Sequence, residues 1–498
     1  MPSSALLVIV AVALTAGSCA GINGGAGTGG GGAGGNLPIL QNDGGGSDLA
    51  PIDAHAETGE GVDMAIDVQG GCRNLACQQT SCKVGGCQQQ PCANGAKTTV
   101  SGTVYDPAGD VPLYGIAVFV PNAPLSPLPQ GVACTHCQAT IENALSVALT
   151  DVKGNFVLDD VPVGENIPMV MEVGKWRRAV TIDVVAACTN TPLNDPNFTR
   201  LPRNQSEGDL PKIALTTGGH DALECLLRKV GIDDSEFSPT DGKGHVNLFA
   251  GEGGTDRYAP SLNGGAMFTP VQPWWDSVDN LKPYDMILYS CEGNPKATNK
   301  SAAAVKAFQA YAEAGGRSFA SHWHNYWFEQ AAPPLSTVAT FDNQTSPLSE
   351  YPSMVDVSFP KGAAMADWLN NVGATPTRGQ LTIEGARNTV TALDSGLAQK
   401  WLYGDSPSTV QYFSANTPIG SVEDQQCGRV VYSDIHVSSG AKPGFPRDRS
   451  LNGPGDPDLG FPFPTGCVTQ GMTPQELALV FMLFDMQSCI LGGVPVIP

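Results

Sequence analysis

The sequence predicts a multi-domain protein in which an antiparallel β-sandwich precedes a doubly wound, flavodoxin-like α/β domain. Short β-rich runs separated by turn residues fill residues 96–190, as in a sandwich. Apolar strands alternate with amphipathic helices over residues 210–492, which is the pattern of an α/β domain with a parallel sheet. An apolar N-terminal run and 14 cysteines in one chain indicate an exported, disulfide-bonded protein.

Residues 1–19 are predicted to be a signal peptide that ends in a lipidation motif. Ala5 to Ala16 is apolar but shorter than the roughly 20 residues that cross a bilayer. Ala-Gly-Ser-Cys at residues 16–19 resembles a bacterial lipobox. The resemblance implies that Cys19 is lipidated and that the protein is a membrane-anchored lipoprotein of the cell envelope, in the periplasm or at the cell surface. The alternative is an ordinary signal peptide that is cut near Ala20.

Two irregular segments are expected before the sandwich. Residues 20–70 begin with the glycine-rich run from Gly21 to Asn36, which predicts a flexible tether. In residues 71–95 a cysteine recurs every five residues, a step that keeps to no face of a strand or a helix. Disulfides are favoured over zinc here, and because the number of cysteines is odd, one of them is expected to bond outside the repeat. These cysteines are Cys72, Cys77, Cys82, Cys87 and Cys92.

The predicted sandwich, residues 96–190, has strand-like runs at 99–105, 116–120, 155–158, 169–173 and 179–185. Three of its stretches resemble the carboxypeptidase regulatory-like domain: TVSGTVYD from residue 99, TDVKGNF from 150 and VPVG from 161. The resemblance implies a transthyretin-like, non-catalytic sandwich that binds carbohydrate or protein. Cys134 and Cys137 form a Cys-x-x-Cys pair in a long insertion, and a structural disulfide is favoured there over a redox-active pair.

The α/β domain is predicted over residues 210–492. Its strands are expected at 212–217, 246–250, 284–290, 317–321 and 429–434. Asp221 is expected to begin the first helix, with Glu224 completing a capping box. Thr473 and Glu476 predict a second capping box at the start of a terminal helix.

Ligands of open α/β sheets lie beyond the carboxyl ends of the strands, and this rule selects the candidate ligand-binding residues. They are His220, Cys291, Glu292, Asn294, His322, Trp323, His324, Asp434 and His436. Three strand ends, at 290–294, 321–325 and 434–436, are expected to converge.

A divalent metal site is one interpretation of this set. His322 and His324 are two residues apart, so they would share a face of an extended segment, and His436, Asp434 and Glu292 would complete the set of metal ligands if the strands are neighbours. A second interpretation is a binding pocket without metal, in which aromatic rings stack on sugar faces. Its rings would come from Trp274, Trp275, Trp323, Tyr326 and Trp327. The third is a degenerate scaffold with no activity.

The strand order over residues 211–490 resembles the class I glutamine amidotransferase-like fold and, within it, the ThuA-like branch. Ser-Cys-Glu-Gly at 290–293 stands where amidotransferases have an oxyanion turn, and Ala-Ser-His at 320–322 where they have the nucleophile elbow. GRVVYSDIH at 428–436 is similar to the strand that carries their catalytic histidine. His322 replaces the thiol nucleophile and Ser438 the orienting glutamate, so glutamine hydrolysis is not expected and no catalytic residue is assigned. Cys291 is either a displaced nucleophile or, as we favour, a disulfide-bonded or buried cysteine.

The net charge of −21 repels nucleic acid, so no nucleic-acid partner is expected. The leading hypothesis is a cell-envelope lipoprotein that binds a carbohydrate or a cell-wall-derived ligand in the α/β domain, with the sandwich as an accessory binding module. The alternative is a hydrolase, metal-dependent in one version, that acts on sugar derivatives or peptides.

Overall fold

The computed structural model describes residues 89–134, 144–343, 348–437, 461–467 and 471–488. The predicted signal peptide with Cys19, the tether, the first four cysteines of the repeat, Cys137 and Ser438 lie outside these residues. Residues 67–498 form one compact unit. In the part of the chain that is described, no helix has both the length and the apolar character needed to span a membrane.

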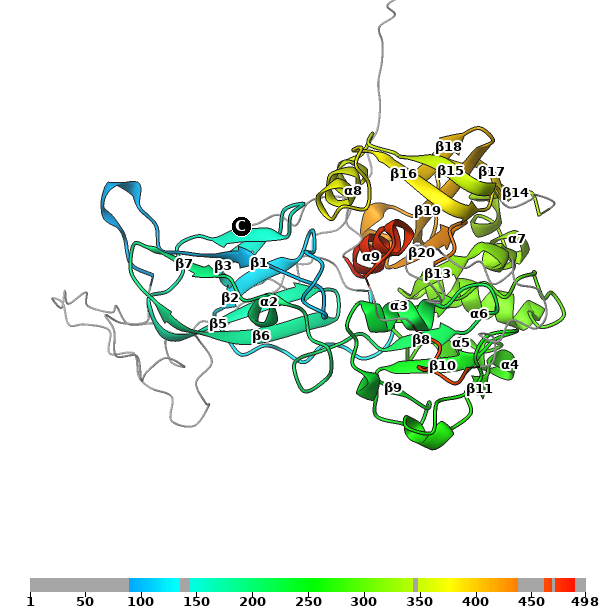
Figure 1. The fold of residues 1–498 in the computed structure, drawn as a ribbon, viewed down its shortest axis with the longest axis horizontal. Coiled ribbons are helices and arrows are strands. Elements are labelled where there is room, and N and C mark those ends of the chain that lie inside the picture. The colour runs from blue at the N-terminus through cyan, green and yellow to red at the C-terminus, as the bar shows by residue number, and fades with distance from the viewer. Residues whose placement is uncertain (1–88, 135–143, 344–347, 438–460, 468–470, 489–498) are drawn as a thin grey trace, which may run out of the picture. The chain divides into compact units, whose positions relative to one another are not determined.

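Residues 99–193 form two small sheets (Figure 1). One has the strand order β4-β1-β7 and the other the order β3-β2-β5-β6. Their bounds are β1 (Thr99–Thr103), β2 (Ala117–Pro121), β3 (Ala144–Leu149), β4 (Asn155–Leu158), β5 (Gly164–Val173), β6 (Trp176–Val185) and β7 (Asn190–Leu193). All five predicted runs are present as strands, whereas β3 and β7 were not predicted.

The prediction of a purely antiparallel sandwich is wrong at one pair, because β1 and β7 run parallel. The sequence of β7, Asn-Thr-Pro-Leu, has little β-propensity, and its Pro192 is tolerated because β7 lies at the edge of its sheet. Polar side chains add to the pairing: the Thr99 hydroxyl donates to Asn190 Oδ1 at 2.9 Å, and Asn190 Nδ2 donates to Ser101 Oγ at 2.9 Å.

The larger part of the chain is built on one 11-stranded sheet with the order β11-β10-β8-β12-β13-β20-β19-β18-β15-β16, and β9 pairs with β10. The parallel strands are β8 (Ile213–Thr216), β9 (Phe237–Ser238), β10 (Val246–Ala250), β11 (Thr269–Pro270), β12 (Met286–Tyr289), β13 (Arg317–Ser321) and β20 (Gly428–Ser433). Antiparallel strands extend the sheet beyond β20: β19 (Ser408–Thr417), β18 (Gln399–Asp405), β15 (Leu348–Val355) and β16 (Gln380–Ala386). The sheet is therefore mixed, and the flavodoxin-like description of this domain stays a prediction.

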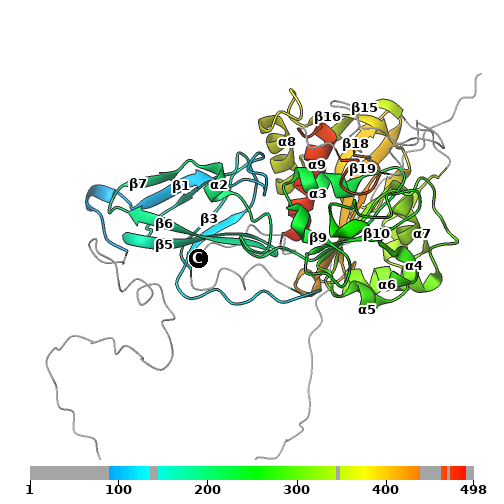
Figure 2. The same ribbon diagram turned by 60° about the horizontal axis from the view of Figure 1, so that its bottom comes forward.

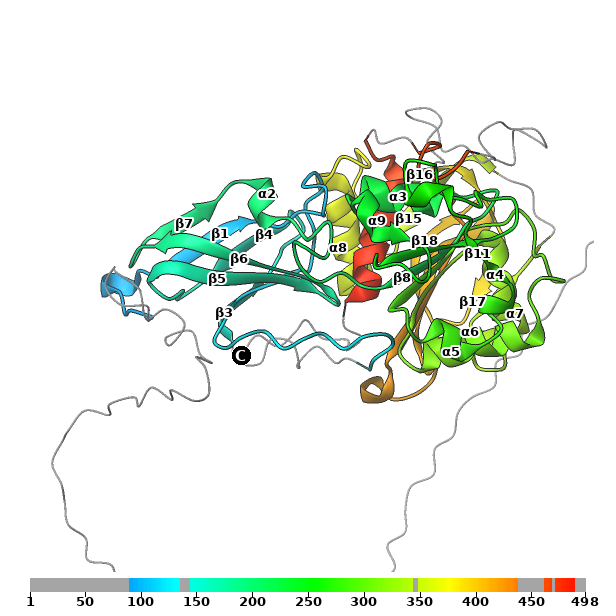
Figure 3. The same cartoon turned by 90° about the horizontal axis from the view of Figure 1, so that it is seen from below.

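Helices cover both faces of this sheet because its parallel strands are apolar on both sides. Ile213 and Leu215 of β8 pack into one core with α3 (Leu223–Lys229) and α9 (Pro474–Gln487), whereas Ala214 between them packs into a second core with α6 (Ala302–Glu313) and α7 (Tyr326–Gln330). Figures 1 and 3 show α3 and α9 on one side of the parallel strands and α5, α6 and α7 on the other.

The remaining elements are short or belong to the antiparallel extension. Figure 2 shows α8 beside that extension, and α8 and α9 contact β15 and β16 respectively. Their bounds are α2 (Pro196–Thr199), α4 (Val271–Trp274), α5 (Val278–Leu281), α8 (Pro360–Asn371), β14 (Ala339–Phe341) and β17 (Val390–Leu393).

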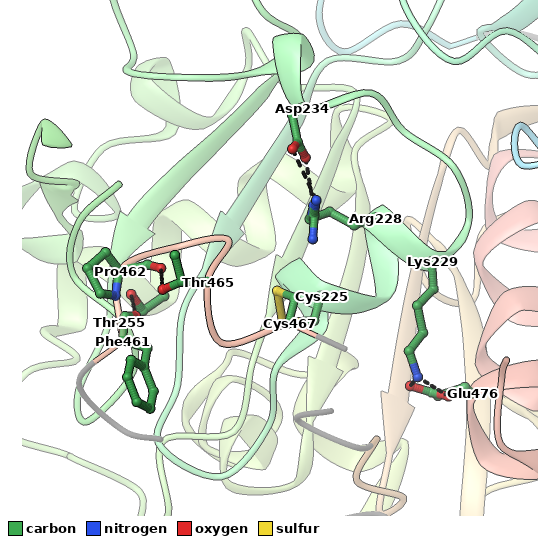
Figure 4. The surroundings of a disulfide bond; sticks show 10 residues. All are labelled: Cys225, Arg228, Lys229, Asp234, Thr255, Phe461, Pro462, Thr465, Cys467 and Glu476. Atoms are coloured by element: carbon green, nitrogen blue, oxygen red, sulfur yellow. Dashed lines mark hydrogen bonds and ion pairs between the residues drawn. A yellow bond between two sulfur atoms is a disulfide. The ribbon is translucent and has the colours of Figure 1, made fainter. Parts of the chain in front are cut away.

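Disulfides join distant segments, as predicted for an exported chain. Cys92 of the repeat bonds to Cys188, which confirms that one cysteine of the repeat pairs outside it. Cys134 bonds to Cys427, so the predicted local pairing within the Cys-x-x-Cys sequence is wrong. Cys225 on α3 bonds to Cys467 and holds residues 461–467 against the α/β domain (Figure 4). The Thr255 hydroxyl secures the same segment by donating to the Phe461 carbonyl at 2.8 Å.

Candidate functional site

The site lies where β12, β13 and β20 end. These strands are neighbours and run parallel in register, with Tyr289 paired to Ala320 and Ser321 paired to Ser433. The residues that follow them therefore reach one edge of the sheet, and the expected convergence of the three strand ends is confirmed. We call this edge, with Asp221, Cys291, His322 and His436, the crest.

His322 makes the sharp turn between β13 and the 3₁₀ helix η4 (His322–Asn325). Its φ is +37°, in the left-handed region that residues other than glycine seldom adopt. Such strain persists only where the surroundings enforce it. Here the Tyr432 hydroxyl donates to the His322 carbonyl at 3.0 Å, and the preceding Ser321 hydroxyl donates to Asp221 at 2.6 Å.

Cys291, His322 and His436 meet at the crest. Cys291 Sγ lies 3.5 Å from His322 Nδ1, and the ring centroids of His322 and His436 are 5.1 Å apart. One potential ligand atom from each of the three residues lies within 4.8 Å of the other two. The side chains are 0, 5 and 2% exposed respectively, so the cluster is almost dry.

The backbone N–H groups of Trp323 and Gly293 act on the Cys291 thiol in the direction that lowers its pKa. Gly293 has φ +86°, and a Cβ there would lie 2.3 Å from the His220 ring, so the turn requires glycine. Burial raises the pKa of the Cys291 thiol to about 12, which outweighs the lowering effect of these two amides. Burial, and then the neighbouring His436, hold the pKa of His322 far below its ordinary value.

Both shifts favour the neutral forms of the thiol and the imidazole. An activated cysteine nucleophile requires the opposite, a thiolate beside an imidazolium. Cys291 is buried and the one free cysteine among the described residues, in agreement with the favoured prediction of a buried cysteine.

His324 does not join the cluster. The predicted ligand set of His322, His324 and His436 is therefore wrong at His324. Its Nε2 hydrogen-bonds with the Ser290 carbonyl at 2.9 Å, and its ring packs 5.4 Å from Tyr289 and 5.9 Å from Trp327. The prediction assumed an extended segment, in which residues two apart share a face. The 3₁₀ turn at 322–325 removes that periodicity and sends the two imidazoles to different places.

The predicted carboxylates also lie outside the cluster. Glu292 forms a buried ion pair with Lys300 and accepts the Glu252 N–H at 3.1 Å. Asp434 accepts the Tyr432 hydroxyl at 2.8 Å and the Thr389 N–H at 2.7 Å. Burial raises the pKa of Asp434 to about 6. The Tyr432 hydroxyl therefore lies between two acceptors, Asp434 Oδ1 and the His322 carbonyl, which share its one proton.

Most of the predicted aromatic pocket is core instead. Trp274, Trp275 and Trp327 are 8, 1 and 1% exposed and pack with α6 and α7. Trp323 is half-buried, and its ring centroid lies 4.7 Å from that of His322. Half-buried His220 and exposed Asn294 are the remaining candidates, and neither belongs to the buried cluster. We call these two residues, with Trp323, the rim.

Asp221 is a site residue that the sequence analysis missed. It was predicted to cap α3, but the N-cap of that helix is Ala222, which makes no side-chain capping bond. Instead the Asp221 carboxylate accepts from the Ser321 hydroxyl at 2.6 Å and from the Val437 N–H at 3.0 Å, which ties the ends of β13 and β20 together. The sequence did carry one signal for this role, because Asp221 directly follows the turn at the end of the first α/β strand, where ligands are expected.

Comparison with known proteins identifies no family for this chain. No family model matches, and neither does any curated protein. Among solved structures, a protein from Bacteroides uniformis described as ThuA-like aligns over 45% of this chain and 82% of its own, with 13% identity and a TM-score of 0.25.

Two cohesin–X-dockerin complexes from Acetivibrio cellulolyticus also align. They share 17 and 16% identity, cover 28 and 27% of this chain and 74 and 85% of their own, and give TM-scores of 0.14 and 0.15. TM-scores this low carry no argument, so the ThuA-like resemblance rests on the sequence motifs at the strand ends.

Proposed function

We propose that the protein is a cell-envelope lipoprotein that binds a carbohydrate or a cell-wall-derived ligand at the crest of its α/β domain. The observation that carries the proposal is Trp323, a half-buried indole that packs on His322 at the rim of a buried polar cluster. Sugar rings present C–H groups on their faces, which pack on aromatic rings, and hydroxyls at their edges, which need polar partners.

Polar groups are present on the neighbouring strand-end turns. A Cβ on Gly293 would lie 2.3 Å from the His220 ring, exposed Asn294 follows Gly293, and Lys296 and Glu252 form a partly exposed ion pair at 3.2 Å. These exposed and partly exposed side chains can donate hydrogen bonds to sugar hydroxyls and accept hydrogen bonds from them. The chemistry of the rim therefore suits a neutral polyol better than an apolar ligand.

We propose the sandwich as an accessory binding module, as its transthyretin-like resemblance implies. A groove of about 540 Å³ lies between the edge strands β3 and β4. Its polar lining includes Gln89, Gln90, Ser146, Asp159 and Asp160. Amide and carboxylate groups of this kind also hydrogen-bond hydroxyls.

We further propose that lipidated Cys19 anchors the protein to a membrane. The support is the Ala-Gly-Ser-Cys sequence at 16–19 together with the disulfides, which are typical of an oxidising compartment. Release of a Cys19→Ser variant from the membrane fraction is the measurement that tests it.

One observation favours the hydrolase alternative. A pocket that only binds sugar has no need of a strained His322 held against a second histidine and a thiol, whereas strained residues cluster at active sites. The two functions share the crest and differ in whether a product is released.

Binding to isolated cell-wall sacculi and calorimetric titration with their soluble fragments test the proposal. Trp323→Ala should weaken binding about tenfold, or ~1.4 kcal/mol, because the stacking face is lost. Val422→Ala, at a side chain that is 62% exposed and precedes β20, at the strand end opposite the crest, is the control and should bind normally. Equal affinity of the Trp323 variant, or no binding by the unmodified protein, would refute the proposal.

Release of reducing sugar that stops in a His322→Ala variant would instead establish the hydrolase.

A further inference from the structure

We propose that Cys291, His322 and His436 bind one divalent transition-metal ion, zinc by preference, and leave a coordination position open for a ligand. The inference deepens the proposed function, since it rests on the crest being the functional site. It assigns the three buried side chains a common role that neither sugar stacking nor core packing gives them.

The geometry is close to that of a tetrahedral site. Zinc bonds of 2.0–2.3 Å place neighbouring ligand atoms roughly 3.3–3.8 Å apart. Cys291 Sγ and His322 Nδ1 are already 3.5 Å apart, and the whole set falls within 4.8 Å. The longest of these separations would have to shorten by about 1 Å for all three atoms to bind one ion.

The backbone holds these ligands in advance. Each follows a different strand, and β12, β13 and β20 are locked side by side by ladder hydrogen bonds. The three ligands lie on the turns directly beyond these strand ends, so the ladder fixes where each of those turns begins. The left-handed backbone of His322, which directs this imidazole toward Cys291, is the strain that such a site would use.

The donor set selects the metal. One thiolate and two imidazoles suit zinc and its transition-metal neighbours, whereas magnesium and calcium require oxygen ligands. The nearby carboxylates of Glu292 and Asp434 are engaged elsewhere, so they add no oxygen to the set. Three protein ligands with a fourth open position are typical of zinc sites that bind water or a substrate.

Surrounding contacts hold the backbone of each ligand. The turn after Cys291 is kept tight by Gly293, whose φ is +86° and where a Cβ would lie 2.3 Å from the His220 ring. The Gln475 side chain donates to the His436 carbonyl at 2.7 Å. The Tyr432 hydroxyl lies 3.0 Å from the His322 carbonyl. A bound cation would also compensate the thiolate charge that burial otherwise disfavours.

Cobalt substitution tests the proposal directly. The full chain, stripped with a chelator and titrated with Co²⁺, should bind one equivalent and show a thiolate charge-transfer band in the near ultraviolet, which Zn²⁺ then abolishes. Cys291→Ser, which is nearly isosteric, should lose that band. His322→Ala and His436→Ala should each weaken metal affinity more than about 100-fold, since the loss of outer-shell contacts alone costs 10–100-fold.

His324→Ala is the matched control, because it removes a buried imidazole two residues from His322 without removing a ligand. It should keep the stoichiometry and the band, and circular dichroism checks that each variant is folded. Less than about 0.1 equivalent of metal, or an unchanged band in folded Cys291→Ser, would overturn the inference. If metal is absent while Trp323-dependent sugar binding persists, only the metal site fails. If metal binds and sugar does not, only the proposed function fails.

Discussion

Asp106 is a buried carboxylate whose ionisation lowers the stability of the fold at neutral pH. Its Oδ1 accepts the N–H groups of Asp110 and Val111 at 2.9 and 3.1 Å, while Oδ2 has no hydrogen-bond partner among the described residues. Burial raises the pKa of Asp106 to about 7 from an ordinary value of 3.8. Between those two values the folded protein keeps a proton that the unfolded chain has released, so this residue makes the free energy of unfolding fall as pH rises from about 4 to 7.

Asp106→Asn should therefore stabilise the protein at high pH only. The amide oxygen still accepts from the turn, while no charge is buried. Chemical denaturation should give similar unfolding free energies for both proteins near pH 4.5, and an advantage of about 2–4 kcal/mol for the variant at pH 8. Other titrating groups, such as Glu172, whose pKa burial raises to about 7, cancel in the difference. A difference independent of pH would contradict this account.

The crest shows which single residues the sequence could predict. Cys291, His322 and His436 were selected because each follows a strand, and the register of parallel strands brings such residues together. The error at His324 came from local conformation, since sequence spacing did not reveal the 3₁₀ turn. The role of Asp221 depends on Ser321 and Val437, 100 and 216 residues away, and local capping rules could not indicate it.

At the scale of elements, α3 and α9 are joined by a buried ion pair (Figure 4). Lys229, in the last turn of α3, donates to both carboxylate oxygens of Glu476 at 2.7 and 2.9 Å, and these side chains are 5 and 0% exposed. Glu476 also completes the predicted capping box by accepting the Thr473 N–H at 2.7 Å. Cation and anion stand at the helix ends that favour their charges.

Lys229→Met should destabilise the protein by about 3–5 kcal/mol, because it leaves the Glu476 charge buried without its cation. Adding Glu476→Gln should recover part of the loss, since the amide keeps an acceptor for the capping bond. Arg378→Ala breaks an exposed pair with Asp367, with side chains 50 and 41% exposed, and should cost less than about 1 kcal/mol. Urea denaturation measures all three, and a Lys229→Met effect as small as that of Arg378→Ala would show that the pair is not a buried charge pair in solution.

Elements with local signals were predictable and those with non-local pairing were not. Five of the seven parallel strands, together with α9, carry apolar runs or a capping box that are visible in a short window, whereas the two-residue strands β9 and β11 were not predicted. The extension from β15 to β19 and the short strand β7 are defined by partners rather than by their own sequences. β15, for example, is exposed at alternate positions and pairs with both β16 and β18.

At the scale of the molecule, the sandwich and the α/β domain share one hydrophobic cluster. Trp176 of β6 packs 5.8 Å from Phe484 of α9, and Tyr114 stacks on Phe481 at 6.0 Å. Trp368 of α8 donates its indole N–H to the Pro112 carbonyl at 2.7 Å. The two composition patterns along the chain indicated separate modules, and composition alone could not reveal that their surfaces pack together.

The proposed lipid anchor at Cys19 would determine whether the whole molecule is attached to a membrane. Residues 21–36, the predicted tether, are largely glycine in composition, and no helix in the described part of the chain can span a bilayer. Attachment should therefore depend on Cys19 alone. Fractionation of cells that make the protein should place the unmodified chain with membranes and the Cys19→Ser variant in the soluble fraction, while Cys291→Ser, which alters a buried cysteine, stays with membranes. Mass spectrometry of the mature N-terminus should find an acylated cysteine. A Cys19→Ser protein that remains membrane-bound would mean that another part of the chain, or a partner, holds it there.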